Sequence, residues 1–251
     1  MSSVEDLEKQ IILGCRIAYN EGIFGRFPFG HLSARHPDGD KFLIPYGLHG
    51  GGKHVGEVEP GDIQILDLDG NLVGGAQKHF FDEIFAHCEI YRARRDVMAI
   101  AHVHPPVAKA MGTTRTEIYP VFSQAAILSA GIKNYEPDDH NPRLIGTPED
   151  GVLLAKALGD AKAVSIRAMA IDVTGASVAD AVCSALILEE NAKMQLAAMQ
   201  AGTPIRVNPV PRPPRPPGSP PSPSAGRNMM WEMLWNFYMK RLMKSEWAIT
   251  L

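Results

Sequence analysis

Hydrophobic and polar positions along the first third of the chain follow two periods. Between residues 3 and 21 the apolar positions recur at helical spacing, which predicts an amphipathic helix. Three short runs of strand-like composition follow at residues 32–35, 41–44 and 63–68. The last of them leads into Asp69-Gly70, a dipeptide that is typical of a tight turn.

The rest of the main segment alternates between the same two patterns. A helix is predicted over residues 79–93, and an apolar strand, residues 97–104, is ended by two prolines. A helix near residues 148–158, strand segments across 163–173 and a long helix over 176–201 follow. Because helices and strands alternate, the pattern favours a layered α/β sandwich.

Composition divides the chain into three parts. Residues 1–206 are predicted to form one α/β domain, and the proline-rich segment 207–226 an extended linker that neither a helix nor a sheet ladder can include. Residues 227–251 regain apolar positions at helical spacing and contain all three tryptophans, Trp231 and Trp235 among them. We expect this last segment to dock on its own domain or on a neighbouring subunit.

The overall charge narrows the possible partners. The 251 residues carry a formal net charge of -3 with a pI near 6.3, so no basic surface for nucleic acid or acidic membranes is predicted. The three cysteines are widely spaced and indicate reduced, buried thiols. The acidic N-terminus and the absence of a long apolar run favour a cytoplasmic protein.

Two histidines stand at the end of the strand predicted for residues 97–104. Side chains at i and i+2 of a strand share one face and lie roughly 7 Å apart, so His102 and His104 are placed to chelate one ion. Two ordinary histidines on a polar strand face are the alternative. On the preceding helix Glu83, His87 and Tyr91 recur every four residues and form one stripe. If that stripe faces the sheet, it brings a carboxylate to the histidines; a surface stripe is the alternative.

These segments together resemble a known family. The run GHLSARHPDGDKFLIPYGL, the Glu-x3-His-x3-Tyr helix and RRDVMAIAHVHPP are similar, in order and spacing, to the class II aldolase/adducin family. The resemblance implies an α/β fold, a three-layer α/β/α sandwich with a mixed, largely antiparallel sheet, assembled as a homotetramer. It also implies that His102 and His104 bind a divalent metal (Fe²⁺, Mn²⁺ or Zn²⁺) and that Glu83 is the catalytic acid/base.

One departure from the family concerns the metal. The third histidine of the family's Arg-Gly-His-Gly strand corresponds to Met169 here, and a thioether is a weak ligand for these ions. Glu83 is the best candidate to complete a set of two histidines and one carboxylate, with His31, His79 and His140 as further possibilities. Loss of the metal site, as in adducin-like members, is the alternative.

Other departures concern the substrate. Phe81-Asp82 replaces the serine pair with which sugar-phosphate aldolases bind phosphate, and an aspartate repels that dianion. The Gly-His-x-Ser-x-Arg strand resembles instead the branch that acts on hydroxylated aromatic or heteroaromatic acids. The residues expected to contact such a substrate are His31, Ser33, Arg35, Tyr46, Trp231 and Trp235.

Three functions follow from this comparison. The first is a metal-dependent lyase that decarboxylates a hydroxylated aromatic acid, with His31 or Glu83 handling the ring proton. The second is a non-haem iron oxygenase acting on an aryl 2-oxo acid, which the missing third histidine suggests. The third is a non-catalytic, adducin-like interaction protein that uses the proline-rich segment.

Overall fold

The computed structural model describes residues 3–25, 27, 29–47, 53–76, 83–137, 144–208 and 227–251. Within these ranges no helix combines the length and the apolar character needed to cross a membrane. Apart from residues 207 and 208, the predicted proline-rich linker lies outside them, as do His79 and His140.

An eight-stranded sheet forms the centre of the described structure, in the order β4-β3-β2-β1-β5-β8-β7-β6. Only β6 and β7 pair in parallel among these strands, so the sheet is mixed and largely antiparallel, as predicted. The strands are β1 (His31–Arg35), β2 (Lys41–Pro45), β3 (Ile63–Asp67), β4 (Leu72–Gly75), β5 (Ala99–Val103), β6 (Ile132–Tyr135), β7 (Ala163–Ile166) and β8 (Ala170–Gly175).

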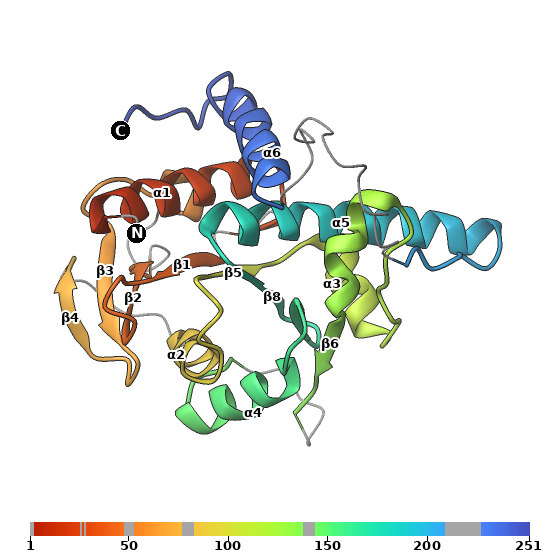
Figure 1. Ribbon diagram of the computed structural model, residues 1–251, viewed down its shortest axis with the longest axis horizontal. Helices are drawn as coiled ribbons and strands as arrows, with labels where there is room; N and C mark the ends of the chain where they lie inside the picture. Colours follow the sequence, from red (N-terminus) through yellow and green to blue (C-terminus); the bar gives the residue numbers. More distant parts are fainter. Residues whose placement is uncertain are drawn as a thin grey trace, which may run out of the picture.

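Helices cover both faces of this sheet (Figure 1). One face carries α1 (Val4–Asn20), α5 (Val178–Ala201) and α6 (Arg227–Leu242), and the other carries α2 (Ile84–Ala93) and α4 (Pro148–Leu158). The remaining helix, α3 (Pro106–Thr113), packs against α5, and two 3-10 turns cover Val55–Glu57 and Ser123–Ala130. The predicted three-layer α/β/α sandwich is confirmed.

The helix boundaries follow from capping side chains. Ser3, Thr147 and Ser177 each accept a hydrogen bond from the backbone N–H three residues later, which begins α1, α4 and α5 close to where the pattern predicts. The helix predicted over 79–93 is seen from Ile84 to Ala93, and residues 79–82 lie outside the described residues.

Alternation along the strands separates two apolar cores. Leu32, Ala34 and Val103 point into the core beneath α1 and α5, whereas Phe42 and Ile100 point into the core beneath α2 and α4. Because successive side chains of a strand face opposite sides, His31, Ser33 and His102 share the face that α2 covers.

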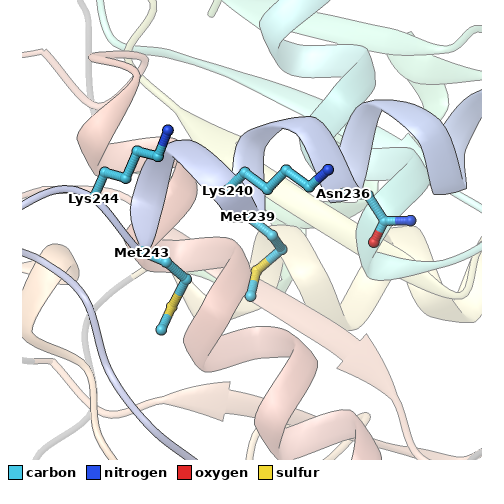
Figure 2. A pocket seen from close by; sticks show the side chains of 5 residues that line it. All are labelled: Asn236, Met239, Lys240, Met243 and Lys244. Carbon is cyan, nitrogen blue, oxygen red and sulfur yellow. The ribbon is translucent and has the colours of Figure 1, made fainter.

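The C-terminal helix packs on the same chain. Trp231 and Leu242 are buried where α6 meets α1 and α5. The outer face of α6 mixes exposed apolar and basic side chains and holds a shallow groove (Figure 2). That groove is lined by Asn236, Met239, Lys240, Met243 and Lys244.

Candidate metal centre and active site

Three neighbouring strands place three polar side chains in one row. In the sheet register His31 of β1 lies opposite His102 of β5, and His102 lies opposite Asp172 of β8. All three are buried, His102 and Asp172 completely. A row of this kind needs internal partners, because burying a charged or polar group without one is costly.

His102 lies between two carboxylates. Its Nδ1–H donates to Asp172 Oδ1 at 2.7 Å, and its Nε2 lies 3.5 Å from Glu83 Oε2. Burial lowers the pKa of His102, but the negative charges of Glu83 and Asp172 outweigh it and raise the pKa to about 9. A raised pKa favours the His102 ring with a proton on each nitrogen near pH 7.

His104 is fixed differently. Its Nδ1–H donates to the backbone carbonyl of Met169 at 2.8 Å. Burial, and after it the positive charge of His102, lower the pKa of His104 to about 4. The ring is thus neutral near pH 7, with Nε2 as its acceptor atom.

Glu83 immediately precedes α2 and brings its carboxylate over the histidine row. Its Oε2 also lies 3.9 Å from His31 Nε2. Ligand atoms of His31, Glu83 and His102 all lie within 4.8 Å of one another, whereas His104 is outside that set. The His102 and His104 rings are nearly perpendicular, with centroids 5.3 Å apart.

The donor atoms at this point suit a divalent transition metal. Among the described residues, His102 Nε2, His104 Nε2 and Glu83 Oε1 are buried and accept or donate no hydrogen bond. The second nitrogen of each of the two histidines is held by a carboxylate or a carbonyl, the usual outer partner of a metal-binding histidine. Two imidazoles and a carboxylate are ligands for Zn²⁺, Fe²⁺ or Mn²⁺.

Met169 contributes its backbone at this site. Its carbonyl oxygen orients His104, and its side chain packs against the apolar core beneath α2 and α4. The preceding residue, Ala168, has a φ of 63°, in the left-handed region that favours glycine. This turn is the place where the family pattern has Gly-His.

A chain of hydrogen-bonding side chains leads from His31 into the interior. His31 Nδ1 lies 3.0 Å from His87 Nε2, and His87 Nδ1 lies 2.7 Å from Ser33 Oγ. Ser33 Oγ in turn lies 2.7 Å from Tyr91 OH. Ser33 is fully buried, and its hydroxyl bonds to His87 and Tyr91 within the chain; its contact with a substrate stays a prediction.

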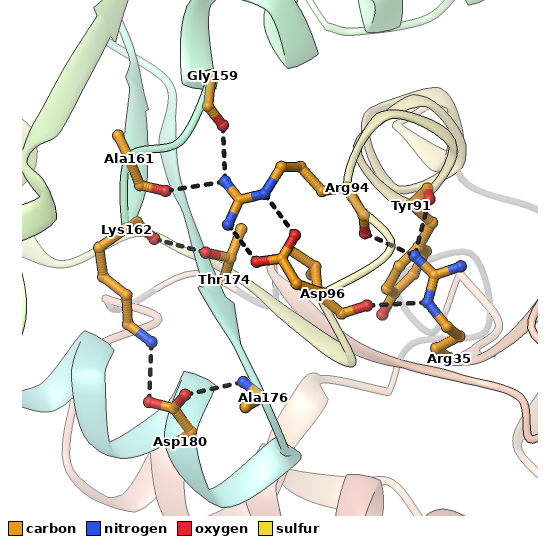
Figure 3. Close-up of polar contacts among 11 residues, drawn as sticks. Arg35, Tyr91, Arg94, Asp96, Gly159, Ala161, Lys162, Thr174, Ala176 and Asp180 are labelled. Atoms are coloured by element: carbon orange, nitrogen blue, oxygen red, sulfur yellow. Dashed lines mark hydrogen bonds and ion pairs between the residues drawn. The ribbon is translucent and has the colours of Figure 1, made fainter. Parts of the chain in front are cut away.

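Arg35 also differs from the expectation of a substrate contact. Its guanidinium donates to the backbone carbonyls of Gly39, Tyr91, Arg94 and Val97. Figure 3 shows the side chain turned toward the carbonyls of Tyr91 and Arg94 at the end of α2. With its donors engaged, Arg35 ties β1 to the α2–β5 connection.

The remaining expected contacts lie on the opposite side of the sheet. Tyr46, Trp231 and Trp235 all pack in or against the core beneath α1 and α5. Within the described residues of this chain they are therefore not brought to the histidines. Trp231 lines a separate cavity of about 550 Å³. Two ion pairs also line it, one between Arg94 and Asp96 and one between Lys162 and Asp180 (Figure 3).

Comparison with known proteins identifies the family of this chain. A model of the class II aldolase and adducin N-terminal domain matches residues 9–196. The chain belongs to this family. Its fold is also that of solved class II aldolases: the L-fuculose 1-phosphate aldolase of Glaciozyma antarctica superposes with a TM-score of 0.73 at 21% identity, covering 97% of this chain and 92% of that one.

Curated relatives within the class II aldolase family include decarboxylases. The 3,4-dihydroxyphthalate decarboxylase of Rhodococcus jostii is 29% identical over 80% of this chain and 84% of its own length. The decarboxylase tropJ of Talaromyces stipitatus is 24% identical over 76% of each chain. These relatives fit the decarboxylase branch and support an enzyme of the lyase type.

Sequence reasoning missed Asp172. The signal is present, because an acidic residue interrupts the apolar run of β8, where every residue is buried. Such a carboxylate is retained in a buried strand only with a partner. That the partner is His102 follows from the pairing of β5 with β8.

Proposed function

We propose that this protein is a metal-dependent decarboxylase of a hydroxylated aromatic or heteroaromatic carboxylic acid. The observation that carries the proposal is the pair of buried Nε2 atoms of His102 and His104 beside the Glu83 carboxylate. The decarboxylases among the relatives support the reaction class.

His102, His104 and Glu83 would hold the ion, with Asp172 and the Met169 carbonyl orienting the two imidazoles. When bound, a divalent ion supplies Lewis-acid stabilisation of the negative charge that develops as carbon dioxide is lost.

Proton handling falls to the ligand Glu83 or to the neighbouring His31. Their Oε2 and Nε2 atoms lie 3.9 Å from each other, so both would border an acid bound at the ion. One of them would control the proton that replaces the carboxylate on the ring. Both are nearly buried, so few water molecules compete with them.

A planar hydroxy acid suits this chain better than a sugar phosphate. Ser33 lies in the strand with which aldolases of the family bind phosphate, but its hydroxyl is hydrogen-bonded to His87 and Tyr91. The sequence also places Phe81-Asp82 before Glu83, where serines would serve a phosphate; both residues lie outside the described structure. The hydroxyl and carboxylate oxygens of an aromatic acid do not require these phosphate-binding serines.

Metal analysis and carbon dioxide release test the proposal together. Protein purified without chelator should contain about one divalent ion per chain, and the double variant His102→Ala/His104→Ala should contain none. Carbon dioxide release is measured with Zn²⁺-, Mn²⁺- and Fe²⁺-loaded protein on a panel of dihydroxybenzoates and 3,4-dihydroxyphthalate. His36→Ala, which changes a histidine away from the site, serves as the control. Undiminished metal content in the double variant would contradict the proposal.

A non-haem iron oxygenase is the second candidate. It is favoured by Met169, which leaves two histidines and one carboxylate as protein ligands, the set typical of non-haem iron oxygenases. Oxygen consumption by the Fe²⁺-loaded protein with an aryl 2-oxo acid, without carbon dioxide release from the hydroxybenzoates, would select it. A protein that takes up none of the three ions would support the non-catalytic alternative.

A further inference from the structure

The three histidines of the site differ in what holds their second nitrogen. For His102 and His104 the partner of Nδ1 is a carboxylate or a carbonyl oxygen, which can only accept. Each Nδ1 must therefore carry a proton, and each Nε2 is the atom available for a metal. For His31 the partner is the ring of His87, and a ring nitrogen can either donate or accept.

The far end of the hydrogen-bond chain decides this ambiguity. Tyr91 is fully buried, and burial raises the pKa of its phenol well above the usual range, so the hydroxyl keeps its proton. Among the described residues the side-chain acceptor within reach of that hydroxyl is Ser33 Oγ, at 2.7 Å. A buried hydroxyl donates where an acceptor is available, so Tyr91 donates to Ser33.

The remaining directions follow in order. Ser33 accepts from Tyr91 and uses its one proton to donate to His87 Nδ1 at 2.7 Å. His87 is fully buried, and burial lowers its pKa to about 3, so the ring is neutral and its single proton is on Nε2. That proton is donated to His31 Nδ1 at 3.0 Å. His31 Nδ1 is then an acceptor, and the proton of the neutral His31 ring is on Nε2.

We propose that His31 is a hydrogen-bond donor to the substrate and is not a metal ligand, and that His87, Ser33 and Tyr91 are positioning residues that fix its Nε2–H tautomer. His31 lies close enough to Glu83 and His102 to suggest a ligand set by distance alone. The direction of its hydrogen bonds excludes it from that set, because His31 Nδ1 accepts from His87 and the only proton of the ring is therefore on Nε2. His102 differs, because it keeps its Nδ1 proton, donated to Asp172, when a metal displaces the proton of Nε2.

This assignment gives His31 a specific task, which rests on the proposed function. An aromatic acid brings its own negative oxygen toward the Glu83 carboxylate, and that approach is repulsive. The neutral Nε2–H of His31 offers a donor to the oxygen without a proton having to move. Its ring stacks on His102 with centroids 4.4 Å apart, which holds the donor beside the ligand.

Side-chain nitrogen NMR of ¹⁵N-histidine-labelled protein tests the tautomer without any substrate. The His31 signals, assigned by their loss in His31→Gln, should show a protonated Nε2 and an unprotonated Nδ1. Adding Zn²⁺ should shift the Nε2 signals of His102 and His104 and leave His31 in the same tautomer. A His31 protonated on Nδ1, or a Zn²⁺-bound His31 nitrogen, overturns the proposal.

Zn²⁺ titration against a chromophoric chelator gives a second measurement. His31→Gln should keep the Zn²⁺ affinity within about threefold, whereas His102→Gln should weaken it by about 100-fold or more. Equal losses in the two variants would make His31 a ligand and overturn the assignment.

A matched pair of variants tests the positioning chain. Ser33→Thr keeps the hydroxyl and should preserve the Nε2–H tautomer of His31, whereas Ser33→Ala removes the donor to His87 and should populate the second tautomer. An unchanged tautomer in Ser33→Ala would contradict the role of the chain. Because the wild-type spectrum alone decides the tautomer, a poorly folded variant does not remove the test.

These measurements separate the two proposals. If no hydroxylated acid is decarboxylated but His31 has the predicted tautomer, the proposed reaction fails and the assignment of His31 stands. If carbon dioxide is released but His31 binds Zn²⁺, the reverse holds.

Discussion

The two faces of β1, β5 and β8 are made by alternate residues of the same strands, yet they provide opposite environments. Toward α2, these strands present a buried polar row of His31, His102 and Asp172, in which His102 donates to Asp172. Toward α1 and α5, they present Leu32, Val103 and other apolar side chains that pack without a polar partner.

The comparison shows how one sheet supports both stability and chemistry. The apolar face stabilises the fold by burying hydrocarbon surface, and it accepts the tryptophans of α6. The polar face gains its order from directed hydrogen bonds, each of which fixes a tautomer or a charge. The two faces should therefore respond differently to substitution, and the following predictions test that independence.

The largest expected effect on stability is on the apolar face, at Trp231. Trp231→Ala removes a side chain that is 6% exposed where α6 meets the domain. We expect the free energy of unfolding to fall by about 3–5 kcal/mol, as for other large-to-small core changes. The Zn²⁺ affinity should stay within about threefold, because the site is on the other face. Urea unfolding of metal-free protein and a Zn²⁺ titration measure the two quantities.

Phe237→Ala is the matched control for this change. Phe237 belongs to the same helix but is 54% exposed, so its loss should alter stability by no more than about 0.5 kcal/mol. If Trp231→Ala weakened Zn²⁺ binding while leaving stability intact, the independence of the two faces would be disproved.

The next effect is on the polar face, at Asp172. Asp172→Asn keeps the size of the side chain but removes the charge and the carboxylate that accepts from His102 Nδ1. Loss of such an outer partner lowers metal affinity by about 10–100-fold. The measurement is the Zn²⁺ dissociation constant obtained by competition with a chelator.

Asp160→Asn, an exposed aspartate before β7, is the control for the change in net charge. Its Zn²⁺ affinity should match that of the wild type. If Asp172→Asn bound Zn²⁺ equally well, Asp172 would be a structural residue only, and the polar row would need another explanation.

Much of this contrast was predictable from the chain. The spacing of His102 and His104 required one face of a strand, and the period of Glu83, His87 and Tyr91 required one stripe of a helix. Both expectations concern neighbours along one segment, where the local backbone geometry is known in advance. In the structure β5 ends at Val103 and α2 begins at Ile84, so His104 and Glu83 lie just beyond these elements. The helices over 3–21, 148–158 and 176–201 were predictable for the same reason, together with their capping residues.

What escaped prediction depends on pairing between distant segments. Asp172 meets His102 only because β5 pairs with β8 in one register, and a shift of one residue would turn it to the other face. Arg35 was expected to contact the substrate because its donors are suited to carboxylates, but in the structure they donate to three backbone carbonyls of the α2–β5 segment and to that of Gly39 in the following turn. Trp231 and Trp235 suited an aromatic substrate by type, whereas the position of α6 placed them on the apolar face.

The smallest effect for a single step is a dependence of metal binding on pH, about tenfold per pH unit. It reports whether His102 is protonated in the metal-free protein. Glu83 and Asp172 raise the pKa of His102 to about 9, so at pH 7 its Nε2 carries a proton that the metal must displace. His104, with a pKa of about 4, has no such proton. The affinity for Mn²⁺ or Zn²⁺ should therefore rise about tenfold per pH unit between roughly pH 6.5 and 8, with one proton released per ion. Calorimetry in two buffers of different ionisation enthalpy counts that proton.

The same raised pKa of His102 stabilises the folded, metal-free protein. This contribution is fully present below the unfolded pKa near 6.5 and is lost as the pH rises toward 9. Metal-free protein should thus become less stable over this window while its affinity for metal increases. A pH-independent affinity would show that His102 is already neutral, and that the two carboxylates do not act on it as the geometry indicates.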